Sequence, residues 1–269
     1  IIGDFKIQKT KIRGVISNGM ICSGKELSLN DDHDGIMILD DALIPGKSLK
    51  NSLKLLDDSV FDFDITPNRG DCFSHIGIAR ELSIIENKNY KKIKPILEYD
   101  NTFKTSDLIK AKISGDNICK RYACRIIKNI QVEESPQWLK NKLNMIGQKS
   151  VNNIVDIANY VMFDLGHPLH VFDYDKLNGT NIEVRLAKNK EKIKCLNQET
   201  KELSSEDIII CDSKEPIAIA GVIGGHGSQV TNKTINILLE CAIFNEINIR
   251  RTSKKHDYDK EASKRFERG

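Results

Sequence analysis

The 269-residue sequence predicts an α+β fold. Two amphipathic helical runs lie mid-chain, over residues 135–147 and 151–165, with apolar side chains recurring at helical spacing. Short apolar runs typical of strands follow at 182–186, 207–211, 217–220 and 235–240. Together the two kinds of segment indicate the α+β class.

The two central helices have recognisable ends. Ser135 is a favoured N-cap residue, and Pro136 suits the first helical position because its missing N–H would be unpaired there. Gly147 and Gly166 can close the two helices in left-handed caps. The chain then turns through HPLH into an apolar pair, and this elbow holds His170 at a fixed point, which makes it a candidate site residue.

Residues 1–50 contain strand-like runs at 5–7 and 35–39, separated by turn residues. The cations near the start of the chain indicate a solvated edge strand, since lysine commonly protects exposed edges. They are Lys6, Lys9, Lys11 and Arg13.

Residues 51–105 are expected to connect two domains. Turn chemistry at 67–70 precedes Asp71, which can cap a helix over residues 71–86. The charged, irregular stretch 86–105 is predicted to be a linker.

Two partial motifs in the first domain are rejected. Residues 19–25 copy the glycine and lysine spacing of a phosphate-binding P-loop, but Glu26 replaces the required hydroxyl and would repel phosphate. Residues 30–41 resemble a calcium loop, but Asp41 is too short to replace the bidentate glutamate readily, and no amphipathic helices flank it. A polar turn is the better interpretation.

Composition narrows the protein class. The net charge of +3 neither proves nor opposes binding to a polyanion. Seven cysteines without a C-x-x-C pair argue against a disulfide framework and a thiolate zinc site, so we expect a reducing, cytoplasmic compartment. The sequence contains no run of about 18 apolar residues, so no membrane span is predicted. The first residue is not Met and the last lies in a helical pattern, so we expect an internal piece of a longer protein.

Three features converge on one candidate site: His170, the glycine-rich loop 221–227 and Glu240. The loop is either a tight inter-strand turn or a place where backbone amides approach a ligand closely. Glu240 can face a pocket or solvent, and the outward position is the commoner one. A metal site at His167 and His170 has only Asp173 nearby as a third ligand and is not predicted.

The basic residues between positions 248 and 269 have two interpretations. They form either a solvated helical face or a surface for phosphates.

Five motifs, in order, resemble the bacterial phenylalanyl-tRNA synthetase beta-subunit family: TPNRGDCFSHIGIARELS, VDIANYVMFDLGHPLHVFD, AIAGVIGGHGSQV, LLECAIF and EASKRFERG. The resemblance covers essentially the whole chain. It implies a partial OB-fold β-barrel, the C-terminal part of a tRNA-binding OB-fold, over residues 1–50. It also implies a mixed α/β editing domain, truncated at its C-terminus, over residues 106–269.

The resemblance implies both a function and a site. In this family the alpha subunit holds phenylalanine in an apolar slot, which rejects an added hydroxyl only by about 10²-fold. The editing domain hydrolyses Tyr-tRNA(Phe) in a second site. The positions that match its pocket are His170, as a tentative catalytic residue, and Glu240, Gly224 and Ala262 around the substrate.

Two further pocket positions depart from the family pattern. Lys149 stands where arginine is usual and loses the planar bidentate fork. Lys260 stands where threonine is usual, as a much larger cation. A second hypothesis follows, in which the editing site is degraded and the chain is a non-catalytic tRNA-binding and assembly scaffold.

The resemblance also implies partners and cofactors. We expect tRNA(Phe) and the alpha subunit as partners, in an alpha2beta2 tetramer, and no membrane. ATP and Mg²⁺ are implied for the whole ligase and none for this fragment, which alone is at most an aminoacyl-tRNA hydrolase.

Overall fold

The computed structural model describes most of the chain, and contacts divide it into two units. The first unit is 1–60 with 144–148, and the second is 61–143 with 149–269. The residues described are 7–29, 32–53, 58–91, 94–97 and 102–268. The predicted boundaries at 50 and 105 stay a prediction.

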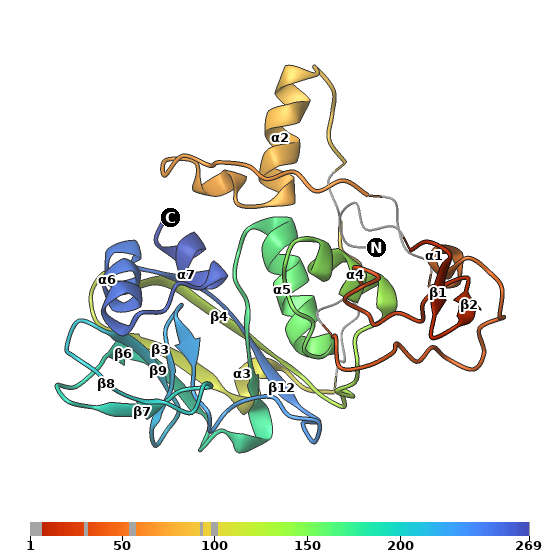
Figure 1. Cartoon of the computed structure of the whole chain (residues 1–269). Helices are drawn as coiled ribbons and strands as arrows, with labels where there is room; N and C mark the ends of the chain where they lie inside the picture. Colours follow the sequence, from red (N-terminus) through yellow and green to blue (C-terminus); the bar gives the residue numbers. More distant parts are fainter. Residues whose placement is uncertain (1–6, 30–31, 54–57, 92–93, 98–101, 269) are drawn as a thin grey trace. The chain divides into compact units, whose positions relative to one another are not determined.

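The first unit is built on one hairpin. Strands β1 (Thr10–Ile12) and β2 (Val15–Ser17) pair antiparallel, and the turn between them has φ values of 51° and 86° at Arg13 and Gly14 (Figure 1). Two positive φ values in a row are what a two-residue hairpin turn of type I′ requires. Helix α1 (Leu49–Ser52) is a single turn. The described residues of this unit form no closed barrel.

One strand prediction in this unit is wrong. Residues 35–39 are irregular, and their described backbone bond runs from the Met37 N–H to the Cys22 carbonyl at 2.9 Å. The side chains of Ile36 and Ile38 are 60% and 87% exposed, so the run does not pack against an apolar surface as a strand of a sheet would. The predicted strand at 5–7 begins outside the described residues.

The second unit contains a five-stranded sheet in the order β11-β10-β9-β6-β3. Its pairs are antiparallel except for β3 and β6, which run parallel. The strands are β3 (Lys110–Ser114), β6 (Asn181–Leu186), β9 (Ile208–Cys211), β10 (Pro216–Ile219) and β11 (Ile223–Gly224). The predictions at 182–186, 207–211 and 217–220 are confirmed within one residue at either end.

A second, antiparallel sheet has the order β4-β12-β5. Its strands are β4 (Cys119–Ile127), β12 (Ile237–Phe244) and β5 (His170–Asp173). The predicted strand at 235–240 therefore begins later and extends four residues further. A hairpin of β7 (Lys192–Lys194) and β8 (Thr200–Glu202) is joined to the β11 end by a bridge between Cys195 and Gly225.

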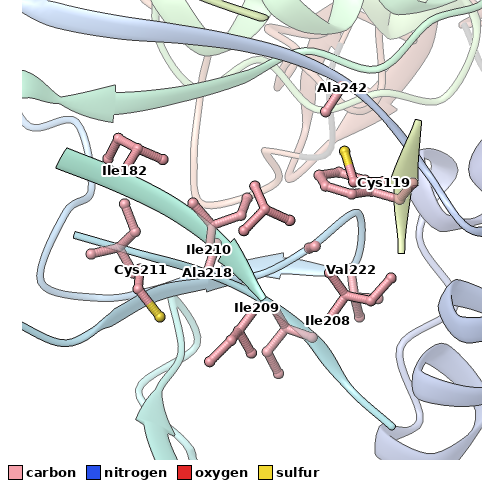
Figure 2. Close-up of a cluster of buried hydrophobic side chains, with 14 of the residues drawn as sticks. Cys119, Ile182, Ile208, Ile209, Ile210, Cys211, Ala218, Val222 and Ala242 are labelled. Atoms are coloured by element: carbon pink, nitrogen blue, oxygen red, sulfur yellow. The ribbon is translucent and has the colours of Figure 1, made fainter. Parts of the chain in front are cut away.

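Apolar side chains from both sheets fill one core (Figure 2). Ile182 and Ile210 come from the larger sheet, and Phe172, Leu238 and Ala242 come from the smaller one. Strand β9 is buried on both faces, as its uninterrupted apolar sequence IIIC requires. The α+β class predicted from the sequence is confirmed.

Helices cover the second unit. They are α2 (His75–Ile85), α3 (Thr105–Leu108), α4 (Gln137–Met145), α5 (Asn153–Leu165), α6 (Glu246–His256) and α7 (Glu261–Phe266), with short 3-10 turns at Gly70–Cys72 and Tyr174–Lys176. None of the described helices is both long and apolar enough to cross a membrane.

The cap predicted for the helix after residue 70 is wrong. Helix α2 begins at His75, and the hydroxyl of Ser74 accepts the Gly77 N–H at 3.0 Å. Asp71 instead accepts two hydrogen bonds from Arg69, which also binds Glu81. The carboxylate of Asp71 therefore pairs with Arg69 and does not cap α2.

A buried carboxylate fixes the elbow that leads to the candidate site. Asp156 on α5 is fully buried and accepts hydrogen bonds from the hydroxyls of Ser135 and Ser150 and from the Val151 N–H. The hydroxyl of Ser135, predicted to cap α4, thus donates to α5. Gly166 ends α5 with φ of 85°, as predicted, and the chain enters β5 at His170.

Candidate functional site

The smaller sheet places Glu240 and His170 side by side. Glu240 on β12 lies opposite His170 on β5 and, on its other side, opposite Cys124 on β4. Directly opposed residues point to the same face of a sheet. Because side chains alternate along a strand, that face also carries Tyr122, two residues before Cys124. The apolar members of the face are Ile126, Phe172, Leu238 and Ala242.

Glu240 is a buried and incompletely paired carboxyl group. The residue is 4% exposed, and no described residue forms a hydrogen bond with its Oε2 atom. Burial disfavours the charged form and raises the pKa of Glu240 to about 8. The group is therefore mostly protonated at neutral pH. The outward position favoured by residue statistics is wrong here.

His170 is held between an aromatic ring and a glycine. Its ring centroid lies 4.5 Å from that of Phe172, in an edge-to-face arrangement. Burial lowers the pKa of His170 to about 4, so the imidazole is neutral at neutral pH. The site thus combines an uncharged acid with an uncharged base.

The glycine-rich loop forms a tight turn, and its backbone also lies close to the His170 ring. Strands β10 and β11 pair across it, so it is the tight inter-strand turn expected as one alternative. A Cβ on Gly224 would lie 2.7 and 2.8 Å from two atoms of the His170 ring and 3.1 Å from Leu196. A Cβ on Gly225 would lie 2.6 Å from the carbonyl oxygen of Ile217. Gly224 therefore faces the site, and Gly225 serves strand packing.

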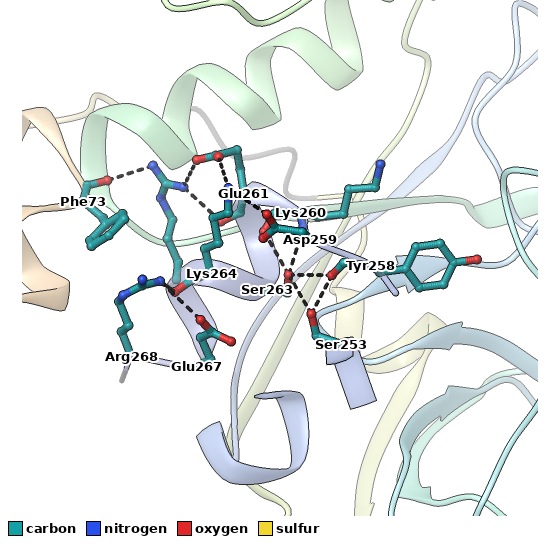
Figure 3. Close-up of polar contacts among 11 residues, drawn as sticks. Phe73, Ser253, Tyr258, Asp259, Lys260, Glu261, Ser263, Lys264, Glu267 and Arg268 are labelled. Carbon is teal, nitrogen blue, oxygen red and sulfur yellow. Dashed lines mark hydrogen bonds and ion pairs between the residues drawn. The ribbon is translucent and has the colours of Figure 1, made fainter. Parts of the chain in front are cut away.

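The remaining predicted pocket residues lie elsewhere in the second unit. Lys260 precedes α7 and is exposed, and its backbone N–H donates to the Ser263 hydroxyl at 3.1 Å (Figure 3). Ala262 is partly buried in the first turn of α7, and Lys149 is exposed.

The residues of the rejected metal site have different contacts in the structure. His167 is 2.9 Å from the Ala242 carbonyl through Nε2, and Asp173 accepts from the Thr234 hydroxyl at 2.6 Å. Across the described residues, the one group with metal-ligand geometry is Asp71, Cys72 and Glu81. Arg69 hydrogen-bonds to both of those carboxylates, at 3.0 and 2.6 Å, so a cation already sits between them.

Comparisons with known proteins identify a family for the part of the chain that holds these residues. The family model described as "B3/4 domain" matches residues 118–269. The chain belongs to this family. The matched B3/4 domain contains β4, β5, β11 and β12, which are the strands that build the candidate site.

The resemblance to the phenylalanyl-tRNA synthetase beta-subunit family is confirmed. The chain is 45% identical over 266 residues to the phenylalanine–tRNA ligase beta subunit of Protochlamydia amoebophila, covering 99% of this chain and 33% of that protein. It is 46% identical over 268 residues to the same-named protein of Syntrophotalea carbinolica, with the same coverage. The chain thus spans about a third of the length of these relatives.

One solved structure shows a weak likeness to the chain. It is an N-terminal fragment of the phenylalanyl-tRNA synthetase beta subunit from Pyrococcus horikoshii, with TM-score 0.40 and 16% identity, covering 65% of this chain and 53% of that one.

Sequence patterns missed two polar residues of this B3/4 domain. Tyr122 and Cys124 share the face of Glu240, and the hydroxyl of Tyr122 is buried without a partner. The available signal in the sequence CKRYACRII is that Arg121 and Arg125 alternate with Tyr122, Cys124 and Ile126. The local sequence around β4 does not show that this strand pairs with β12.

Replacing Gly224 with alanine should disturb His170 selectively. The new Cβ would overlap the imidazole, so the ring must move, and we expect a loss of about 1–2 kcal/mol in the free energy of unfolding. Denaturant unfolding and the ring proton signals of His170 measure both effects. Gly227→Ala is the matched control, because no heavy atom lies within 4 Å of its Cβ position. Equal behaviour of the two variants would contradict the close approach.

Proposed function

We propose that this B3/4 domain is the hydrolytic editing part of a phenylalanine–tRNA ligase beta subunit and acts on Tyr-tRNA(Phe). The observation that carries the proposal is the buried Oε2 atom of Glu240, which has no hydrogen-bond partner among the described residues. An unpaired buried polar atom costs about 1–3 kcal/mol, so a site that retains one favours a ligand that satisfies it.

The chemistry of the two amino acids supports this choice. Tyrosine differs from phenylalanine by one hydroxyl group, which an apolar synthetic pocket rejects by only about 10²-fold. A second site that hydrogen-bonds the hydroxyl can discriminate far more strongly, because phenylalanine would leave its polar groups unpaired. The carboxyl of Glu240, set among Phe172, Leu238 and Ala242, has the required character.

His170 has a different role in this proposal. Its neutral imidazole lies opposite Glu240, where it can accept a hydrogen bond from the attacking water or from the 3′ end of the tRNA. Gly224 leaves the ring the space that a side chain would fill. Ala262, Lys149 and Lys260 remain proposed members of the substrate pocket.

A second function is favoured by the departures at Lys149 and Lys260. If these two lysines have removed the editing activity, the chain serves as a scaffold that binds tRNA and assembles with the alpha subunit. The exposed basic residues of α6, Arg250, Arg251 and Lys254, suit contact with phosphates under either function.

Partners and location follow as proposals from the names of the relatives. We propose tRNA(Phe) and an alpha subunit as partners in an alpha2beta2 enzyme of the cytoplasm. ATP and Mg²⁺ would serve the aminoacylation step in other parts of that enzyme.

Hydrolysis of preformed Tyr-tRNA(Phe) by the complete enzyme tests the two functions against each other. We expect deacylation by the natural sequence, equal or faster deacylation by Lys260→Thr, and a loss of at least about 10²-fold in Glu240→Ala. An inert natural sequence that Lys260→Thr restores would show that the editing site is degraded, as the scaffold function requires. An inert enzyme that no variant restores would also reject editing.

A further inference from the structure

Buried polar atoms without partners are few in the described residues, and two of them share one surface. They are the Tyr122 hydroxyl and Glu240 Oε2; the others are Ser114 Oγ, Arg265 Nε and Arg268 Nε. The two arginines bind partners through their terminal nitrogens, and Ser114 belongs to the five-stranded sheet. Tyr122 and Glu240 alone of this group lie on the smaller sheet.

The strand register brings these two groups together. Glu240 pairs with Cys124, and Tyr122 lies two residues away along β4, opposite Ala242. Tyr122 and Glu240 are therefore diagonal neighbours on one face, a separation that a long side chain such as tyrosine can span. Burial first, and then the nearby carboxylate, raise the pKa of Tyr122 well above its usual value. The phenol accordingly remains a hydrogen-bond donor.

A single ligand hydroxyl can satisfy both groups. A phenol hydroxyl has one proton to donate and lone pairs to accept, so it can donate to Glu240 Oε2 and accept from Tyr122. A ligand without that hydroxyl leaves two buried groups unpaired. Discrimination should therefore be stronger than one contact provides.

We propose that Tyr122 is a second specificity-determining residue, which reads the hydroxyl of the substrate together with Glu240. This inference rests on the proposed editing function. It assigns Tyr122 to recognition of the amino-acid side chain and not to the hydrolytic step.

The test is Tyr122→Phe in the complete enzyme, with deacylation of Tyr-tRNA(Phe) and Phe-tRNA(Phe) measured separately. We expect the rate at subsaturating Tyr-tRNA(Phe) to fall by about tenfold or more, and the rate with Phe-tRNA(Phe) to stay unchanged. The melting temperature should be unchanged or higher, because the variant removes an unpaired buried hydroxyl. Lower activity with equal or greater stability is a result that a purely structural tyrosine would not give.

Tyr160→Phe is the matched control, since this tyrosine lies on α5 and its ring packs against that of Trp138, away from the smaller sheet. It should leave both rates unchanged. A Tyr122→Phe enzyme with natural rates and an inactive Glu240→Ala enzyme would overturn this inference alone. Equal losses on both esters would also overturn it. An inert natural enzyme would remove the proposed function and this inference with it.

Discussion

Replacing Asp207 with alanine is expected to lower the free energy of unfolding by about 3–5 kcal/mol. This aspartate precedes β9, is 1% exposed, and accepts hydrogen bonds from Ser204, Thr252, Lys255 and His256. Burial alone would raise the pKa of Asp207, but these donors together hold it below its usual range. Alanine leaves several donors, including the buried His256, without their acceptor.

The pH dependence of that loss has a definite sign. A carboxyl whose pKa is lower in the folded state contributes stability above its unfolded pKa and loses it as the pH falls. The difference between the natural chain and Asp207→Ala should therefore shrink in acid. Urea unfolding at several pH values measures it. Glu206→Ala is the matched control, because its exposed pairing with Arg251 at 3.6 Å contributes at most about 1 kcal/mol. Similar losses in both variants would contradict the role of Asp207.

Replacing Glu240 with glutamine is expected to flatten the decline of stability with rising pH. In the folded chain the pKa of Glu240 is about 8, which is above the ordinary value of 4.5 that applies to the unfolded chain. Between these two pH values the folded chain therefore holds one more proton than the unfolded chain. The free energy of unfolding must then fall as pH rises through this window, by up to about 1.4 kcal/mol per pH unit. Glutamine carries no such proton and mimics the neutral acid.

His170 contributes a slope of opposite sign. Its pKa of about 4 is below the usual 6.5, so its contribution is lost as pH falls through that window. Comparing Glu240→Gln with the natural chain isolates the glutamate, because both retain His170. The measurement is urea unfolding from pH 5 to 8, with Glu202→Gln on the exposed face of β8 as control. Parallel profiles for the natural chain and Glu240→Gln would show that the carboxyl is not desolvated.

Local patterns in the sequence predicted the elements that are regular by themselves. Helix α5 carries an uninterrupted apolar stripe between Asn152, whose side chain caps it, and Gly166, so its limits are readable. Strands β9 and β10 are short apolar runs bounded by turn residues. The run at 35–39 is similarly apolar but pairs with no strand among the described residues, and composition alone does not show whether a partner strand exists.

The candidate site was predictable only in part. Local features of the sequence and the family motifs both indicate His170, Gly224 and Glu240, and the structure brings these three together. Their contact depends on β12 pairing with both β4 and β5, which joins residues far apart in the sequence. Tyr122 was missed for this reason, since neither composition nor spacing shows which strand lies beside it.

The relative rates at which the complete enzyme deacylates Tyr-tRNA(Phe) and Phe-tRNA(Phe) test the central claim most directly. If Glu240 reads the hydroxyl in a buried pocket, the natural enzyme should favour the tyrosyl ester by about 10² or more. Glu240→Ala should reduce that preference to near one. Equal rates on both esters in the natural enzyme, or an undiminished preference in Glu240→Ala, would contradict it.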